Sequence, residues 1–251
     1  MGQAMKRWKW MAAALALVWG GMAVAAEPVP AAVAAAITKN IEASRPDLKV
    51  KSVTASEMPG LYAVQIGDGP TVYATADGRY FVLGDLFEVK AGGFVNLAEQ
   101  QRNGERAKLI AEVKPADMII FKPEGKPKAV INVFTDVDCF YCQKLHQEVP
   151  ELNKRGIEVR YLAWPRSGTT GETYNKMVTA WCAKNRQQTL TQLKARAPVP
   201  LKSCTPNPVA HQYQLGVKMG LEGTPAMIMP DGTLLPGYMP AANLAQALGV
   251  K

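Results

Sequence analysis

The pattern of hydrophobic and polar residues divides the chain into two regions. In the first, the Ala-rich stretch 31–44 carries Val33, Ile37 and Ile41 at helical spacing, which predicts a helix. Alternating runs then predict strands at residues 48–56, 60–67 and 69–84, joined by hairpin-type turns at 67–70 and 77–78. An α+β unit of about 60 residues is small for independent stability. Pairing of an edge strand with a second copy of the chain is therefore our hypothesis for this region.

A charged stretch separates the two regions. Residues 97–113 are rich in Leu, Ala and Glu and predict a helix, although Gly104 weakens its middle. Its polarity is typical of a linker that crosses solvent between two domains, and equally of an ordinary surface helix. Both interpretations stay open on the pattern alone.

The second region begins with a strand, a helix and a strand in succession. Residues 129–134 form a continuous apolar run, which is typical of a strand buried on both faces. Residues 139–154 repeat apolar positions at helical intervals and predict a helix. Residues 156–165 predict another strand. This order is a βαβ unit. Four further elements are predicted: a mostly helical segment at 173–196, a helix at 209–219, two strands around an Asp231-Gly232 turn within 223–237, and a C-terminal helix at 242–249.

The first 26 residues differ from both regions. They combine Lys6, Arg7 and Lys9 with a short uncharged run that ends in Ala-Val-Ala-Ala, the pattern of a secretory signal peptide cleaved after Ala25 or Ala26. A retained membrane anchor is the alternative, but the apolar run is shorter than the about 20 residues that span a bilayer. We therefore expect export.

Removal of this segment lowers the formal net charge from +8 to about +5. The remaining basic residues are spread along the chain, without a Lys/Arg block or interleaved aromatic residues. This distribution gives nucleic-acid binding little support.

The cysteines at positions 139, 142, 182 and 204 all lie in the second region. Export implies a compartment in which disulfides persist. Of the three pairings that four cysteines allow, the spacing favours Cys139 with Cys142 and Cys182 with Cys204. The second bridge would close a loop of about twenty residues, which the chain-entropy model associates with on the order of 3 kcal/mol of stability.

The segment FTDVDCFYCQKLH, which contains Cys139 and Cys142, has four interpretations. A structural zinc site needs four ligands, and the nearest further donor, His146, is at a position more typical of a partly exposed polar residue. Haem attachment needs a His where Gln143 stands. A structural disulfide would close a loop of only two residues and gain little. A reversible redox pair explains the position of both cysteines.

A cysteine in the first turn of a helix lies where unpaired backbone N–H groups and the helix dipole stabilise a thiolate. Cys139 is therefore predicted to be an exposed attacking thiolate, and Cys142, one turn deeper, a sheltered resolving thiol. Asp138 has two opposite effects, because its carboxylate opposes the thiolate but interacts favourably with the dipole. Farther along, a cis Thr224-Pro225 bond would leave the Thr224 backbone free to pair with substrate near the cysteines, and a trans turn is the alternative.

Together these segments resemble the periplasmic thiol:disulfide interchange proteins of the DsbC type. The resemblance covers most of residues 130–238 in the family's order, and residues 57–89 resemble the family's dimerisation domain. The matching segments in the first of these ranges are FTDVDCFYCQKLH, GIEVRYLAWPRSG, WCAKN, Ser203-Cys204, LGVKMGLEGTPAMIM and DGTLLPGY.

The resemblance implies an α+β protein in four parts: a signal peptide at 1–26, a cystatin-like dimerisation domain at 27–93, a helical linker at 94–114, and a thioredoxin-like catalytic domain with inserted helices at 115–251. It implies that Cys139 attacks, that Cys142 resolves and that Thr224-Pro225 is a cis-proline loop. Thr224, Pro225, Phe140 and Tyr141 would bind substrate, and Cys182–Cys204 would be a structural disulfide. Neither a cofactor nor a metal is expected.

The resemblance also implies partners and an activity. A V-shaped homodimer in the periplasm would bind misfolded exported proteins with non-native disulfides, a membrane thiol reductase would supply electrons, and some members act as chaperones. Phe140-Tyr141 departs from the Gly-Tyr of the best-known isomerases and the Pro-Tyr of a DsbG-like branch. We expect a disulfide isomerase. The alternatives are a DsbG-like reductase of sulfenylated cysteines and a chaperone without redox turnover.

Overall fold

The computed structural model describes residues 28–250 except positions 68 and 70. The predicted signal peptide and part of the first predicted turn therefore lie outside the described residues. The described residues form two compact units, one that ends at Gly84 and one that begins at Asp85. Both contain helices and sheets, which confirms the α+β prediction. In the described part of the chain, no helix combines the length and apolar character needed to cross a membrane.

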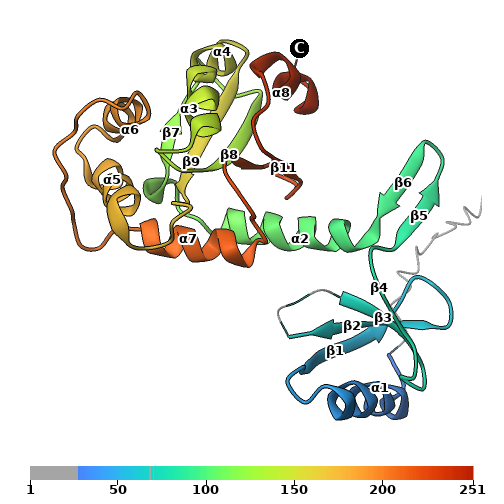
Figure 1. The fold of residues 1–251 in the computed structure, drawn as a ribbon. Coiled ribbons are helices and arrows are strands. Elements are labelled where there is room, and N and C mark those ends of the chain that lie inside the picture. Colours follow the sequence, from blue (N-terminus) through green and yellow to red (C-terminus); the bar gives the residue numbers. More distant parts are fainter. Residues whose placement is uncertain (1–27, 68, 70, 251) are drawn as a thin grey trace, which may run out of the picture. The chain divides into compact units, whose positions relative to one another are not determined.

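The first unit packs one helix on a four-stranded antiparallel sheet (Figure 1). Its elements are α1 (Ala31–Ser44), β1 (Val50–Ala55), β2 (Leu61–Ile66), β3 (Thr71–Thr75) and β4 (Phe81–Leu83), and the strand order is β1-β2-β3-β4. Ile37, Val64 and Val72 form the centre of its core. The predicted helix and strands are thus confirmed. Gly78 has a φ of 64°, and a Cβ there would lie 2.8 Å from the Cα of Ile37, so the predicted turn requires glycine.

The second unit begins with a hairpin that the sequence pattern did not predict. Its strands are β5 (Phe87–Lys90) and β6 (Gly93–Asn96), followed directly by α2 (Leu97–Ala111). The Asn96 side chain accepts a hydrogen bond from the Glu99 N–H at 2.9 Å and so caps α2. The last turns of α2 pack on this unit, because Ile110 is buried with Phe134 in its core. Within its own unit, α2 is therefore a surface helix with one buried face.

A five-stranded sheet organises the rest of the unit. The strands are β7 (Ile119–Phe121), β8 (Ala129–Thr135), β9 (Ile157–Ala163), β10 (Ala226–Ile228) and β11 (Leu234–Pro236), in the order β11-β10-β8-β9-β7. β8 and β9 are parallel and confirm the predicted βαβ unit, while the other pairs are antiparallel. The apolar run that predicted β8 is buried at its centre, where Ile131 and Phe134 are 0% exposed.

The remaining helices are α3 (Phe140–Gln147), α4 (Val149–Lys154), α5 (Gly171–Cys182), α6 (Arg186–Lys194), α7 (Val209–Lys218) and α8 (Ala241–Ala247), with a 3-10 turn at Pro115–Asp117. The segment predicted to be one helix at 139–154 is divided into α3 and α4, and the segment predicted to be mostly helical at 173–196 contains α5 and α6. α3 ends before Pro150, which lies in the first turn of α4, where its missing N–H costs nothing. Asn185 starts α6 as its N-cap, since its side chain accepts from the Gln188 N–H at 3.0 Å.

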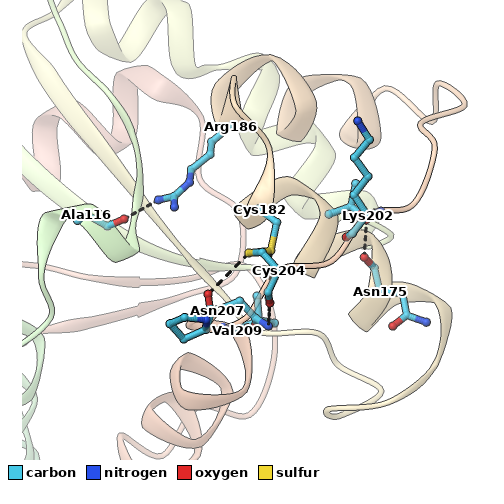
Figure 2. Close-up of a disulfide and its surroundings, with 10 residues drawn as sticks. Ala116, Asn175, Cys182, Arg186, Lys202, Cys204, Asn207 and Val209 are labelled. Carbon is cyan, nitrogen blue, oxygen red and sulfur yellow. Dashed lines mark hydrogen bonds between the residues drawn. A yellow bond between two sulfur atoms is a disulfide. The ribbon is translucent and has the colours of Figure 1, made fainter.

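A disulfide joins the end of α5 to the loop before α7 (Figure 2). Cys182 and Cys204 have an S–S distance of 2.06 Å and a Cα–Cα distance of 5.6 Å. This is the pairing that the spacing favours. The Asn207 side chain donates to the Cys204 carbonyl at 3.1 Å and accepts from the Val209 N–H at 3.3 Å. These contacts hold the Cys204 loop to the start of α7.

Candidate active site

Cys139 and Cys142 lie where β8 leads into α3, at the junction that the βαβ pattern predicts. Cys139 is the N-cap of α3, and its Sγ accepts a hydrogen bond from the Cys142 N–H at 3.4 Å. Both cysteines are free thiols. The first turn of a helix thus contributes a backbone donor to the Cys139 sulfur, as a stabilised thiolate requires.

The Thr224-Pro225 bond is cis and lies against Cys139. β10 follows it directly and pairs with β8, so that Ala226 is opposite Phe134 and the loop reaches the cysteines. The Thr224 carbonyl accepts a hydrogen bond from the Cys139 thiol at 3.2 Å. The Thr224 backbone was predicted to be free for substrate, but its carbonyl is engaged by Cys139 while that thiol is protonated.

The prediction that Cys139 is exposed is wrong. Its exposed fraction is 3%, and that of Cys142 is 0%. The Cys139 sulfur turns back toward the helix start and is covered by the cis-proline loop, so both thiols are shielded. The exposed residues are the two between them, Phe140 at 64% and Tyr141 at 56%. An incoming disulfide would reach Cys139 beside these aromatic rings.

The two thiols differ strongly in acidity. A hydrogen bond from the Cys142 thiol, the Cys142 backbone N–H and the positive charge of Arg166 together lower the pKa of Cys139 to about 5, although burial opposes the shift. The pKa of Cys142 is raised well above its usual range, mainly because the thiol is buried and secondly because the thiol donates a hydrogen bond to Cys139. At neutral pH the pair therefore holds one thiolate, on Cys139.

Asp138 does not oppose this thiolate directly. Its carboxylate accepts a hydrogen bond from the Thr173 hydroxyl at 2.7 Å and forms an ion pair with Lys176 at 3.1 Å. Asp136 is buried nearby and accepts hydrogen bonds from the Asp138 N–H at 2.7 Å and the Arg166 N–H at 2.9 Å. The sequence left open whether the Asp138 carboxylate opposes the Cys139 thiolate. In the structure Lys176 balances the charge of Asp138, so this opposition is weakened.

Comparison with known proteins identifies the family. One family model, a thioredoxin-like domain, matches residues 114–250, and another, the N-terminal domain of disulfide bond isomerase proteins, matches residues 27–99. The thiol:disulfide interchange protein DsbC of Escherichia coli strain K12 is 34% identical over 201 residues, which are 80% of this chain and 82% of the relative. The chain belongs to the DsbC family. DsbC of Salmonella typhimurium is 36% identical over 186 residues, 74% of this chain and 75% of the relative.

Among solved structures, a disulfide interchange protein from Neisseria gonorrhoeae aligns with a TM-score of 0.48 and 26% identity, covering 55% of this chain and 100% of that one. The family models and the DsbC relatives confirm the resemblance read from the sequence, and with it the thioredoxin-like fold. The protein is a thiol:disulfide interchange enzyme of the DsbC family.

In this DsbC-family site, a buried polar cluster lies next to Cys142. His146 was predicted to be partly exposed, but it is only 9% exposed, and its ring nitrogens lie 3.1 Å from the Tyr161 hydroxyl and 2.9 Å from the Thr191 hydroxyl. Burial and then the charge of Lys194 lower the pKa of His146 to about 3, so its ring is neutral. Among the described residues, no three His, Cys, Asp or Glu side chains are grouped to hold a metal ion.

Lys194 itself was missed by the sequence analysis. It is 4% exposed, and its Nζ donates to the Thr135 hydroxyl at 2.7 Å. The helical spacing could have indicated that Lys194 is buried, because it follows the buried Leu190 by four residues and so lies on the apolar face of α6. A lysine at a core position of a helix is rare unless it has a partner.

Titration of the reduced protein should show one thiolate with a midpoint near pH 5. The folded-state pKa of Cys139, about 5, lies below the ordinary thiol value of 9.0. The resulting stabilisation of the reduced fold is complete above pH 9.0 and is lost as the pH falls through about 5. The thiolate absorbance, followed with pH in the wild type and in Cys142→Ala, measures this midpoint. A midpoint above pH 8 in the wild type would contradict the expectation.

Proposed function

We propose that the protein isomerises incorrect disulfides in exported proteins of the periplasm through Cys139-Phe140-Tyr141-Cys142. The observation that carries this proposal is the geometry of the pair: Cys139 is the N-cap of α3 and its sulfur accepts a hydrogen bond from the Cys142 N–H, while Cys142 is fully buried behind it. The Cys139 thiolate attacks a substrate disulfide, forms a mixed disulfide and releases one substrate thiolate. A second substrate thiolate then displaces Cys139, which leaves a new substrate disulfide and the enzyme unchanged.

Cys142 provides the exit when no substrate thiolate arrives. Its sulfur attacks Cys139, releases the substrate and leaves a Cys139–Cys142 disulfide. This outcome reduces the substrate by two electrons and oxidises the enzyme. A further thiol donor must restore the dithiol, and a membrane thiol reductase is the donor that we propose.

The surface beside Cys139 supports binding of unfolded chains. Phe140 and Tyr141 are exposed and contact each other edge to face, with ring centroids 5.4 Å apart. Tyr141 also stacks on Tyr238 at 6.5 Å. Such an apolar surface fits hydrophobic segments of misfolded proteins. We propose that these rings, together with Thr224 and Pro225, bind substrate, and that the same surface gives chaperone activity.

The first unit supports a homodimer. β4 is an edge strand whose residues Phe81, Val82 and Leu83 are 61%, 60% and 65% exposed. An exposed apolar edge can pair with another strand. We propose that residues 27–93 dimerise through this edge, with residues 94–114 as linker and 115–251 as catalytic domain. We also propose that residues 1–26 direct export and are removed.

Refolding of a scrambled protein with several disulfides tests the proposed function. Pre-reduced protein lacking residues 1–26 is added in a glutathione buffer, and the matched control is the same protein with its reactive thiol alkylated. We expect native activity to return faster than in buffer only with the reduced form, because only that form offers the Cys139 thiolate.

The alternatives give different results in the same assay. A DsbG-like reductase would leave the scrambled protein unchanged but reduce a sulfenylated protein with a single cysteine. A chaperone without redox turnover would suppress aggregation equally well with the thiol alkylated. Either result without isomerisation would refute the proposal.

A further inference from the structure

An ammonium group is buried beside the resolving cysteine. Lys194 ends α6, and its Nζ donates to the Thr135 hydroxyl at 2.7 Å and lies 3.5 Å from the Cys142 carbonyl oxygen. It also lies 5.3 Å from the centroid of the Tyr161 ring. These contacts from β8, α3 and β9 fix the charge next to Cys142. The ammonium group of a lysine on the surface would not be held in one position in this way.

Burial of this charge needs an explanation. An unpaired buried ammonium is unfavourable, and Lys194 makes no ion pair among the described residues. Burial lowers the pKa of Lys194 to about 8, while negative charge on Cys142, Cys139 and Asp136 opposes the shift. The ammonium form therefore predominates at neutral pH, and the groups that act on it are mainly the two thiols.

The other titratable groups around Lys194 do not supply a changing charge. Apart from Cys142, these groups are Asp136 after β8, Cys139 and His146 of the α3 segment, and Tyr161 of β9. His146 is neutral, burial raises the pKa of Tyr161, and Asp136 is paired with Arg166 at 3.2 Å. In the mixed disulfide Cys139 is uncharged as well. Cys142 is then the group whose charge changes.

We propose that Lys194 is a positioning residue for the resolving step, in which its ammonium group stabilises the Cys142 thiolate that attacks Cys139. This inference rests on the roles of Cys139 and Cys142 in the proposed function. Cys142 gives up its thiol proton and its sulfur bonds to the Cys139 sulfur. The bond between Cys139 and the substrate sulfur breaks, and the substrate leaves as a thiolate that takes up a proton. The enzyme dithiol loses two electrons and the substrate disulfide gains them.

The test uses dithiobis(nitrobenzoate), an aromatic disulfide whose released thiolate is coloured. Attack by Cys139 releases one equivalent, and resolution by Cys142 releases the second. For Lys194→Met we expect the first phase to stay within about twofold of wild type and the second to slow by about tenfold or more, because a nearby opposite charge shifts a pKa by one unit or more. The matched control is Lys154→Met, the same change at an exposed position of α4.

Two further measurements separate this role from a structural one. Methionine removes the buried charge and keeps much of the side-chain length, so the reduced variant should unfold at the same or higher denaturant concentration. In a Cys139→Ala background, alkylation of Cys142 at pH 7 should slow by about tenfold or more when Lys194 is also replaced.

Three results would count against the proposals, and they are distinguishable. An unchanged second phase in Lys194→Met would overturn the role of Lys194. Equal slowing of both phases with lower stability would also overturn it, in favour of a structural role. Absence of the first phase in the wild type would instead refute the proposed function, because Cys139 would not be the attacking thiol.

Discussion

Replacement of Cys139 by alanine should abolish disulfide exchange, whereas replacement of Cys142 should trap the enzyme on its substrate. The thiolate is the nucleophile, and of the two free cysteines in the described residues Cys139 is the one whose pKa, about 5, lies below pH 7. Cys142 cannot take its place, because each unit by which its raised pKa exceeds the pH lowers the thiolate fraction about tenfold. We expect Cys139→Ala to lose at least about a thousandfold in rate.

The Cys142→Ala variant keeps the attacking thiolate but has no resolving thiol. We expect it to accumulate a mixed disulfide with scrambled substrate and to lose reductase activity, while part of the isomerase activity remains through substrate thiolates. Non-reducing electrophoresis and intact mass measure the adduct. As a control, the Cys182–Cys204 disulfide should remain intact in both variants, which shows that the substitutions affect the redox pair alone. An adduct formed equally by Cys139→Ala would show that the roles of the two cysteines are assigned wrongly.

Much of the fold could be predicted because its signals are local. The helical spacing of Val33, Ile37 and Ile41 predicted α1 with its observed bounds. The apolar run of β8 and the alternation in the first unit were equally clear. The short strands β7, β5 and β6 were not predicted, because three or four residues hold too little periodicity by themselves, whereas the equally short β10 and β11 were predicted with the help of the Asp231-Gly232 turn between them.

The candidate site was only partly predictable, for a different reason. Cys139 and Cys142 are only three positions apart, so their spacing and the strand before them pointed to a redox pair. The contact of Cys139 with Thr224 bridges 85 positions, and that of Lys194 with Thr135 bridges 59. These contacts depend on the pairing of β10 with β8 and on the packing of α6. Exposure of Cys139 was misjudged because the loop that covers it comes from this distant segment.

A substitution at the turn between β10 and β11 should destabilise the second unit strongly. Gly232 has a φ of 85°, where a residue with a Cβ is strained by about 1–2 kcal/mol. A Cβ there would also overlap the Asn103 carbonyl oxygen of α2 and lie 2.7 Å from the Ala107 nitrogen. Since backbone cannot yield like a flexible side chain, Gly232→Ala would push α2 away and disturb the 2.9 Å hydrogen bond from Arg106 to the Met219 carbonyl.

We expect Gly232→Ala to lower the free energy of unfolding by about 3 kcal/mol or more, as steric overlap and backbone strain add. Gly104→Ala is the matched control, because this exposed glycine lies in the interior of α2 with nothing within 4 Å of its new Cβ. That change should stabilise by about 0.5–1 kcal/mol through helix propensity. Chemical denaturation gives both values, and amide exchange in α2 locates the loss. Equal stability of Gly232→Ala and wild type would mean that α2 does not pack against this turn.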